Sequence, residues 1–216
     1  ECTYSLEHYD DFNDRIKSRA EKNPSNIRVA AMSAFAAHQM EQTDSYPFCK
    51  NPNELITFSN TKNHIPNYNE FINTLLVEMN QRSTAWEPKN NATVSGFHTS
   101  GNLFSKPNKM LKILESVIEK ELELFFEKFK SLDNGLIQNW PKQTNIKAWY
   151  VRMLKNGHQR GHIHPSACIS GVFYLKTVES PQEQEGAIEF GLHGYAYPIK
   201  NKEYPRQIYQ PSNGDI

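Results

Sequence analysis

The sequence predicts an α+β fold in which an antiparallel sheet sandwich carries helices on one outer face. Two observations predict it. Apolar residues with helical spacing dominate the chain up to about residue 129, and short strand-like runs divided by turns follow the segment Asn139-Trp140-Pro141. The length of 216 residues suits one large domain, or one domain with a helical appendage.

Four helices are expected, over residues 4–20, 27–42, 67–81 and 107–129. Ser25 is placed to cap the second helix, and Pro107 suits the first turn of the fourth. The first two helices cannot bury their apolar stripes alone, so they must dock on the rest of the chain or stack on further helices. Residues 86–104 lack helical spacing and are expected to be extended, with turns at Gly96 and Gly101.

Strands are expected where β-branched and aromatic residues gather between turns. These runs cover residues 146–154, 167–178, 187–190 and 207–209.

Composition excludes several classes of partner. The 24 Lys and Arg balance 24 Asp and Glu, so the net charge of zero argues against nucleic acid and against an anionic membrane. No run of 18 apolar residues is present to span a bilayer. The scattered Cys2, Cys49 and Cys168 indicate free thiols in a reducing compartment, so a cytoplasmic location is expected.

Three of the eight histidines lie within seven residues, at His158, His162 and His164. On a strand, the i and i+2 positions of His162 and His164 would throw both imidazoles to the same face, spaced to hold one metal ion. Imidazole suits Fe, Zn, Cu or Ni, so the spacing does not name the metal. The alternative is a solvated turn beside Lys155 and Arg160 that binds nothing.

The histidine segment and its neighbours resemble the family of 2-oxoglutarate and Fe(II)-dependent oxygenases that is often fused to tetratricopeptide repeats in bacteria. The resemblance covers about residues 145–216, and the flanks of Tyr46-Pro47-Phe48-Cys49 resemble the family's lead-in only loosely. The residues that carry it are Trp149-Tyr150-Val151-Arg152-Met153-Leu154, Gly157-His158, His162-Ile163-His164-Pro165, Ser170-Gly171-Val172-Phe173-Tyr174-Leu175 and Gly186-Ala187-Ile188-Glu189-Phe190.

The resemblance implies two regions and a more specific fold. Residues 46–216 would form a double-stranded β-helix, or jelly roll. Residues 1–45 would be a helical lead-in packed on it, as the end of a tetratricopeptide-like array. The cofactor implied is Fe(II), with 2-oxoglutarate as cosubstrate.

The resemblance also implies the metal ligands. His162 matches the first ligand of the family, and His164 stands where the wider superfamily carries a carboxylate. An imidazole donates less charge to the metal than a carboxylate does, so metal preference would differ.

Three further residues are candidates for binding the cosubstrate. Tyr174 matches a tyrosine that bonds the far carboxylate of 2-oxoglutarate in related prolyl hydroxylases, although a core aromatic is an equal alternative. Ser170 would line the pocket, or bond the backbone instead. Arg152 would anchor an anion, although an exposed strand arginine is the more common case. Met153 replaces a tyrosine of the relatives, so that contact does not transfer.

The third metal ligand and the cosubstrate arginine of the family follow a turn like the one formed by residues 209–216. The resemblance therefore predicts a C-terminally truncated member that lacks both. His193 is the only later histidine, and its flanking glycines indicate a loop rather than a ligand position.

The function expected is hydroxylation of an unknown substrate, either a protein side chain or a small molecule. Two alternatives stay open. A cupin-type metalloenzyme would share the jelly roll without 2-oxoglutarate, but Cys168 and Ile169 occupy the places where cupins carry a glutamate. A non-catalytic binding module on a degenerate jelly roll is the other.

Overall fold

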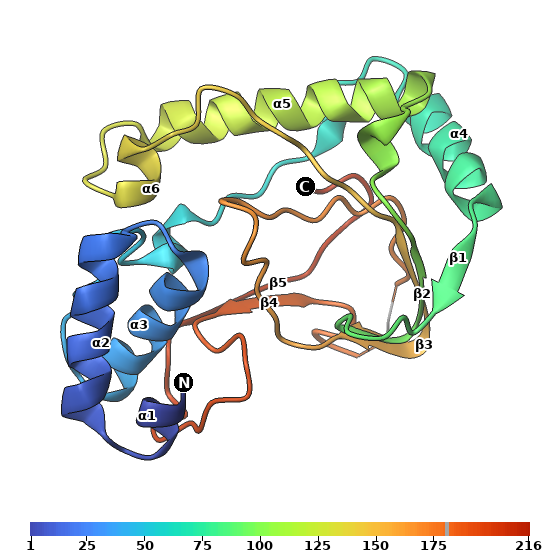
Figure 1. Ribbon diagram of the computed structural model, residues 1–216. Coiled ribbons are helices and arrows are strands. Elements are labelled where there is room, and N and C mark those ends of the chain that lie inside the picture. The colour runs from blue at the N-terminus through green and yellow to red at the C-terminus, as the bar shows by residue number, and fades with distance from the viewer. Residues whose placement is uncertain (180–181) are drawn as a thin grey trace.

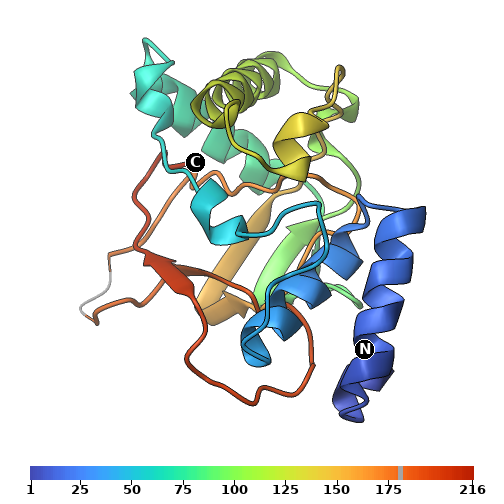
Figure 2. The same cartoon turned by 90° about the vertical axis from the view of Figure 1, so that its left-hand side faces the viewer.

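The fold is α+β, as the sequence predicts, and the computed structural model describes residues 1–179 and 182–216 (Figure 1). Helices α1–α3 gather at one side, α5 runs across the top, and the strands lie beneath it. Turned by 90°, Figure 2 shows α4 and α5 together above the strands. No helix among the described residues is both long and apolar enough to cross a membrane.

The N-terminal helices are α1 (Cys2–Ser5), α2 (Tyr9–Lys22) and α3 (Ile27–Gln39). One helix over residues 4–20 was expected, and the chain forms two, because Glu7 adopts a left-handed φ of 61° between them. Glu41, with φ of 53°, likewise follows the early end of α3. The cap of α3 is Asn26 rather than Ser25, since its side chain accepts a hydrogen bond from the amide of Val29 at 3.2 Å.

Helices α4 (Tyr68–Gln81) and α5 (Lys109–Phe129) confirm the other two predicted helices, and a short α6 (Gly135–Gln138) follows. Helix α5 begins two residues after Pro107 because Asn108 caps it, with its side-chain oxygen 3.0 Å from the amide of Leu111. Three single turns of 3-10 helix, η1 (Pro52–Leu55), η2 (Thr61–Asn63) and η3 (Leu103–Ser105), lie in the connections.

Replacing the cap of α5 tests this assignment. The substitution Asn108→Ala removes the acceptor for Leu111, and we expect it to lower the free energy of unfolding by about 1 kcal/mol. Asn108→Ser keeps a capping oxygen and should recover most of that loss. Urea unfolding of both variants measures the difference, and equal losses would contradict the capping role.

The described strands form two antiparallel sheets. Strands β1 (Thr84–Trp86), β2 (Thr93–Thr99) and β3 (Val151–Gln159) form one, with β2 in the middle. Strands β4 (Ile188–Gly191) and β5 (Arg206–Tyr209) form the other. Gly96, expected in a turn, lies inside β2, where the register shifts and where a Cβ would come 2.9 Å from the sulfur of Met153.

The strand expected over residues 167–178 is not formed. Two backbone hydrogen bonds link Tyr174 to the C-terminal segment, its amide to the Asp215 carbonyl at 2.8 Å and its carbonyl to the Gly214 amide at 2.7 Å. Residues 214–216 pair on their other side with Ser59 and Thr61. A single paired residue is too little for a ladder, so the jelly roll stays a prediction of the resemblance.

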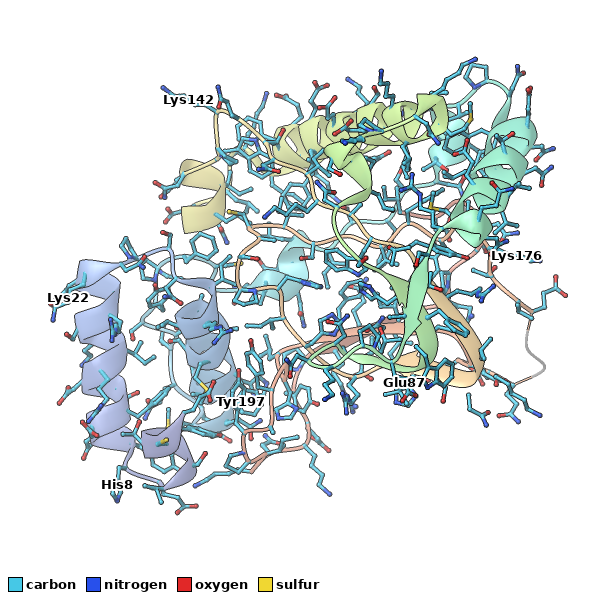
Figure 3. The ribbon with its side chains drawn as sticks, turned by 45° about the vertical axis from the view of Figure 1, so that its right-hand side comes forward. His8, Lys22, Glu87, Lys142, Lys176 and Tyr197 are labelled. Carbon is cyan, nitrogen blue, oxygen red and sulfur yellow. The ribbon has the colours of Figure 1, made fainter. Side chains whose placement is uncertain are left out.

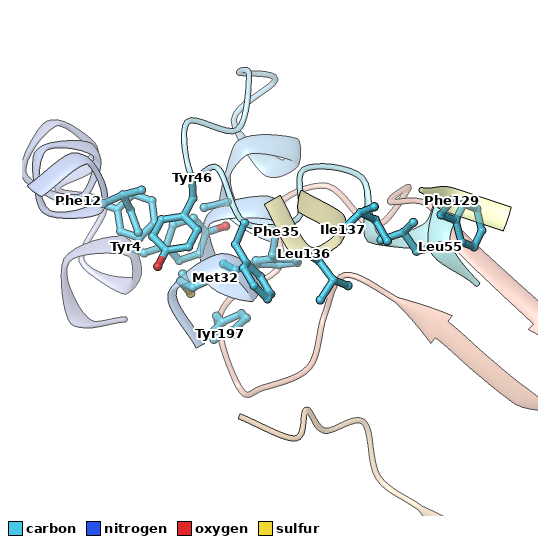
Figure 4. Packing of buried hydrophobic residues seen from close by; sticks show 14 residues of the cluster. Tyr4, Phe12, Met32, Phe35, Tyr46, Leu55, Phe129, Leu136, Ile137 and Tyr197 are labelled. Carbon is cyan, nitrogen blue, oxygen red and sulfur yellow. The ribbon is translucent and has the colours of Figure 1, made fainter. Parts of the chain in front are cut away.

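Two apolar cores among the described residues hold these parts together. One joins α1–α3 to residues from the second half of the chain, among them Phe129, Leu136 and Tyr197 (Figure 4). The other lies between α4 and α5 and includes Leu175. Figure 3 shows Tyr197 on its loop beside α3. The N-terminal helices therefore dock on the rest of the chain, which was one of the two ways expected for them to bury their apolar faces.

Candidate metal-binding site

His162 and His164 lie in the loop that follows β3, not on a strand as their spacing suggested. Their rings nevertheless meet, with the two Nε2 atoms 3.2 Å apart and the ring planes at 83° to each other. The convergence comes from the loop conformation, because residues 160–169 form no strand.

A backbone carbonyl sets the tautomer of His162. Its Nδ1 lies 2.7 Å from the carbonyl oxygen of Arg160, which can only accept a hydrogen bond. The proton therefore sits on Nδ1, and Nε2 presents a lone pair toward His164. Metal-binding histidines are typically fixed in this way, by donating the other ring N–H to a carbonyl or carboxylate.

The geometry of the pair fits two ligands on one metal ion. With metal–nitrogen bonds of about 2.1 Å, neighbouring octahedral positions place two nitrogens about 3.0 Å apart, and tetrahedral positions about 3.4 Å. The observed 3.2 Å lies between these values, and without an ion it is the length of a hydrogen bond between the two rings. Two imidazoles suit Fe(II), so the donors present fit the ion that the resemblance implies. Among residues 1–179 and 182–216, no group of three His, Cys, Asp or Glu forms a complete site.

The protonation state of His164 also favours metal binding. Burial lowers its pKa, and the neighbouring imidazole of His162 lowers it further. A neutral imidazole is the form that binds a metal ion. His164 is half-buried, whereas His162 is exposed.

Two further aromatic side chains, Trp149 and His98, lie in a row beside the ring of His164. Neither was a candidate functional residue in the sequence. The indole of Trp149 lies 5.3 Å from the ring of His164 and 5.8 Å from that of His98, centroid to centroid. Trp149 opens the motif run and precedes Val151 by two residues, so strand alternation could have placed it on one face with Val151. His98 carried no signal, because its contact depends on how β2 pairs with β3.

Comparison with known proteins adds one finding. Residues 147–216 match the model of a family described as "Putative 2OG-Fe(II) oxygenase". No curated protein and no solved structure matches the chain. The matched region contains both histidines and Trp149, and it supports the resemblance drawn from the motifs.

Arg152, also in the matched region, lies on the other face of the sheet. It pairs with Phe97 in the register, and its guanidinium lies 4.8 Å from the centre of the Phe97 ring. His98 pairs with Val151 and faces the opposite side. The structure therefore does not bring Arg152 to the histidine pair. Ser170 is exposed in the segment beyond His164.

Tyr174 lies beside Asp215 and Tyr209 in the matched region. Burial raises its pKa to about 12, with the Asp215 carboxylate and Tyr209 adding to the effect. Its hydroxyl is thus protonated at neutral pH and able to donate a hydrogen bond. The same carboxylate would repel a second anion, so the predicted contact with 2-oxoglutarate needs Asp215 to be screened by its own partners.

Those partners are present. Asp215 accepts hydrogen bonds from the amide of Ser212, the hydroxyl of Tyr209 and the side chain of Asn60, each at 2.7 Å. Burial alone would raise the pKa of Asp215, but these bonds together hold it below its ordinary value.

Asp215 should therefore contribute pH-dependent stability. Because its folded pKa is depressed, the contribution is present above the unfolded pKa of about 4 and is lost as the pH falls through the folded pKa. We expect Asp215→Asn to lower the unfolding free energy by about 1–3 kcal/mol at pH 7 and by less in acid. Asp14→Asn, at an exposed position on α2, is the control. Equal losses at pH 7 and pH 3 would contradict the assignment.

His193, the alternative third ligand, points elsewhere. Its Nε2 lies 2.9 Å from the carbonyl oxygen of Tyr197, and its ring packs 5.1 Å from that of Phe35. The backbone of its loop does come close to the histidine segment, since a Cβ on Gly194 would lie 2.6 Å from the side chain of Ile163. The loop of His193 packs against the segment between the two histidines, but the His193 imidazole is not directed at the pair.

Proposed function

We propose that the chain carries the metal-holding part of a 2-oxoglutarate and Fe(II)-dependent oxygenase that hydroxylates a substrate. The observation that supports it most is the 3.2 Å approach of the Nε2 atoms of His162 and His164, inside the region that matches the oxygenase family model. The proposal needs both the histidine geometry and the family match. A pair of imidazoles can bind many metals, and a family match by itself does not identify the residues of a site.

The two histidines have distinct tasks in this proposal. His162 presents its Nε2 lone pair because the Arg160 carbonyl keeps the proton on Nδ1. His164 stays neutral in its half-buried position and takes the neighbouring place on the ion. When bound, Fe(II) with 2-oxoglutarate and O2 supplies the oxidation, in which the cosubstrate becomes succinate and CO2 and one oxygen atom enters a substrate C–H bond.

Tyr174 is the residue proposed to bind the cosubstrate. Its phenol remains a donor at neutral pH, which suits a carboxylate partner. Ser170 and Arg152 stay proposals with less support, since Ser170 is exposed and Arg152 lies across the sheet from His98.

The test is anaerobic addition of Fe(II) and 2-oxoglutarate, followed by air. A weak visible charge-transfer band before air, and succinate after it, are the expected results. Metal binding without a band or succinate would favour the cupin-type alternative. No metal binding at all, with a partner protein still bound, would favour the non-catalytic module.

A further inference from the structure

The ring of His164 lacks the anchor that His162 has. The Nδ1 of His162 is held by a backbone carbonyl at 2.7 Å. Within residues 1–179 and 182–216, no hydrogen bond holds the Nδ1 of His164. Among the aromatic rings of the described residues, those in contact with it are the imidazole of His162 and the indole of Trp149. In the metal-free chain the Nε2 of His164 donates a hydrogen bond to the lone pair on the Nε2 of His162 at 3.2 Å. A bound metal ion would take both lone pairs and end that bond, so another contact must then orient the ring of His164.

Trp149 lies two residues before the start of β3, and the next residue is bonded to β2. The amide of the next residue, Tyr150, donates to the hydroxyl of Thr99 at 2.9 Å, and the Tyr150 carbonyl accepts from the Thr99 amide at 3.0 Å. These bonds extend the β2–β3 pairing and fix the backbone that carries the indole. A side chain next to backbone that is fixed by a sheet is a more rigid support than one on an unbonded loop.

His98 supports the indole in turn. Its ring stacks on that of Trp149 with an interplanar angle of 19°, and its Nδ1 lies 2.6 Å from the carbonyl of Thr99. That carbonyl fixes the orientation of the His98 ring, because it can only accept. The indole thus has a neighbour of fixed orientation and contacts the ring of His164.

We propose that Trp149 is a positioning residue, which holds the imidazole of His164 in the orientation that completes the histidine pair. The inference rests on the proposed function, because it needs the pair to bind a metal ion. Groups that orient a ligand typically change metal affinity about 10- to 100-fold when removed. A contact between aromatic rings lies at the low end of that range, and a smaller aromatic ring would keep most of it.

The experiment titrates Ni(II) into the metal-free chain and measures its dissociation constant. We expect Trp149→Ala to weaken binding about tenfold, and Trp149→Phe to stay within about threefold of the original chain. The matched control is Trp86→Ala, which removes another half-exposed tryptophan of the same sheet, one that contacts Phe97 instead. That control should bind Ni(II) as the original chain does.

Tryptophan fluorescence gives a second readout that a merely structural role would not move. Ni(II) bound at His164 should quench the emission of Trp149, so quenching should persist in Trp86→Ala and be lost in Trp149→Phe. Equal Ni(II) affinity in the original chain and in Trp149→Ala would overturn the positioning role alone. An original chain that binds no Ni(II) would overturn the proposed metal site, and this inference with it.

Discussion

Removing His162 should weaken metal binding more than any other single substitution. In His162→Ala the remaining imidazole of His164 would hold the ion alone, and we expect the affinity for Ni(II) to fall by more than about 100-fold, beyond the loss seen when only a supporting group is removed. Formation of succinate from 2-oxoglutarate should fall to background in the same variant. Calorimetric titration and a succinate assay measure the two effects.

The matched control is His158→Ala, four residues earlier on β3. His158 is also exposed, and its Nδ1 also faces a backbone carbonyl, that of Asn156 at 3.3 Å, but within the described part of the chain no second imidazole contacts it. It should bind Ni(II) like the original chain. If His158→Ala lost as much affinity as His162→Ala, the assignment of the ligand pair would be wrong.

The largest effect on stability is expected from Phe35→Ala. Phe35 is fully buried on α3, and its ring contacts those of Tyr4, His193 and Tyr197 at 5.1–6.0 Å. Truncation of a buried phenylalanine costs about 3–5 kcal/mol, because the contacts are lost and a cavity remains. Urea unfolding measures the change.

The same substitution should also disturb the proposed metal site. Phe35 packs against His193, and the loop of His193 lies against Ile163, between His162 and His164. Val77→Ala, on an exposed position of α4, is the control and should change the unfolding free energy by less than about 0.5 kcal/mol. Equal unfolding energies for the two variants would contradict the place given to Phe35 in the core.

The long helices could be predicted because their apolar faces are continuous. Residues 67–81 and 107–129 bury one stripe each, and the structure confirms both. The prediction of one helix over residues 4–20 was wrong at Glu7. Its left-handed backbone conformation ends the first helix there, although the amino-acid pattern gives no sign of a break. The prediction of a strand around Tyr174 was wrong for another reason. Whether a segment forms a strand depends on the segment that pairs with it, and not only on the β propensity of its own residues.

At the site, spacing predicted which residues meet but not how they meet. His162 and His164 converge through a loop, held by the Arg160 carbonyl and by the ring of Trp149. Contacts of this kind join residues distant in the sequence, such as His98 and Trp149, and they follow from the pairing of β2 with β3. The face on which Arg152 lies follows from the same pairing, so the sequence left it open.

The most direct test of the central claim counts the imidazoles on one bound ion. Pulsed electron paramagnetic resonance of a stoichiometric Cu(II) complex reports that number, and imidazole is a common ligand for Cu(II). Two histidines on one ion predict two imidazoles in the original chain and one in His164→Ala. One imidazole or none in the original chain, or two that persist when both His162 and His164 are replaced by alanine, would contradict it.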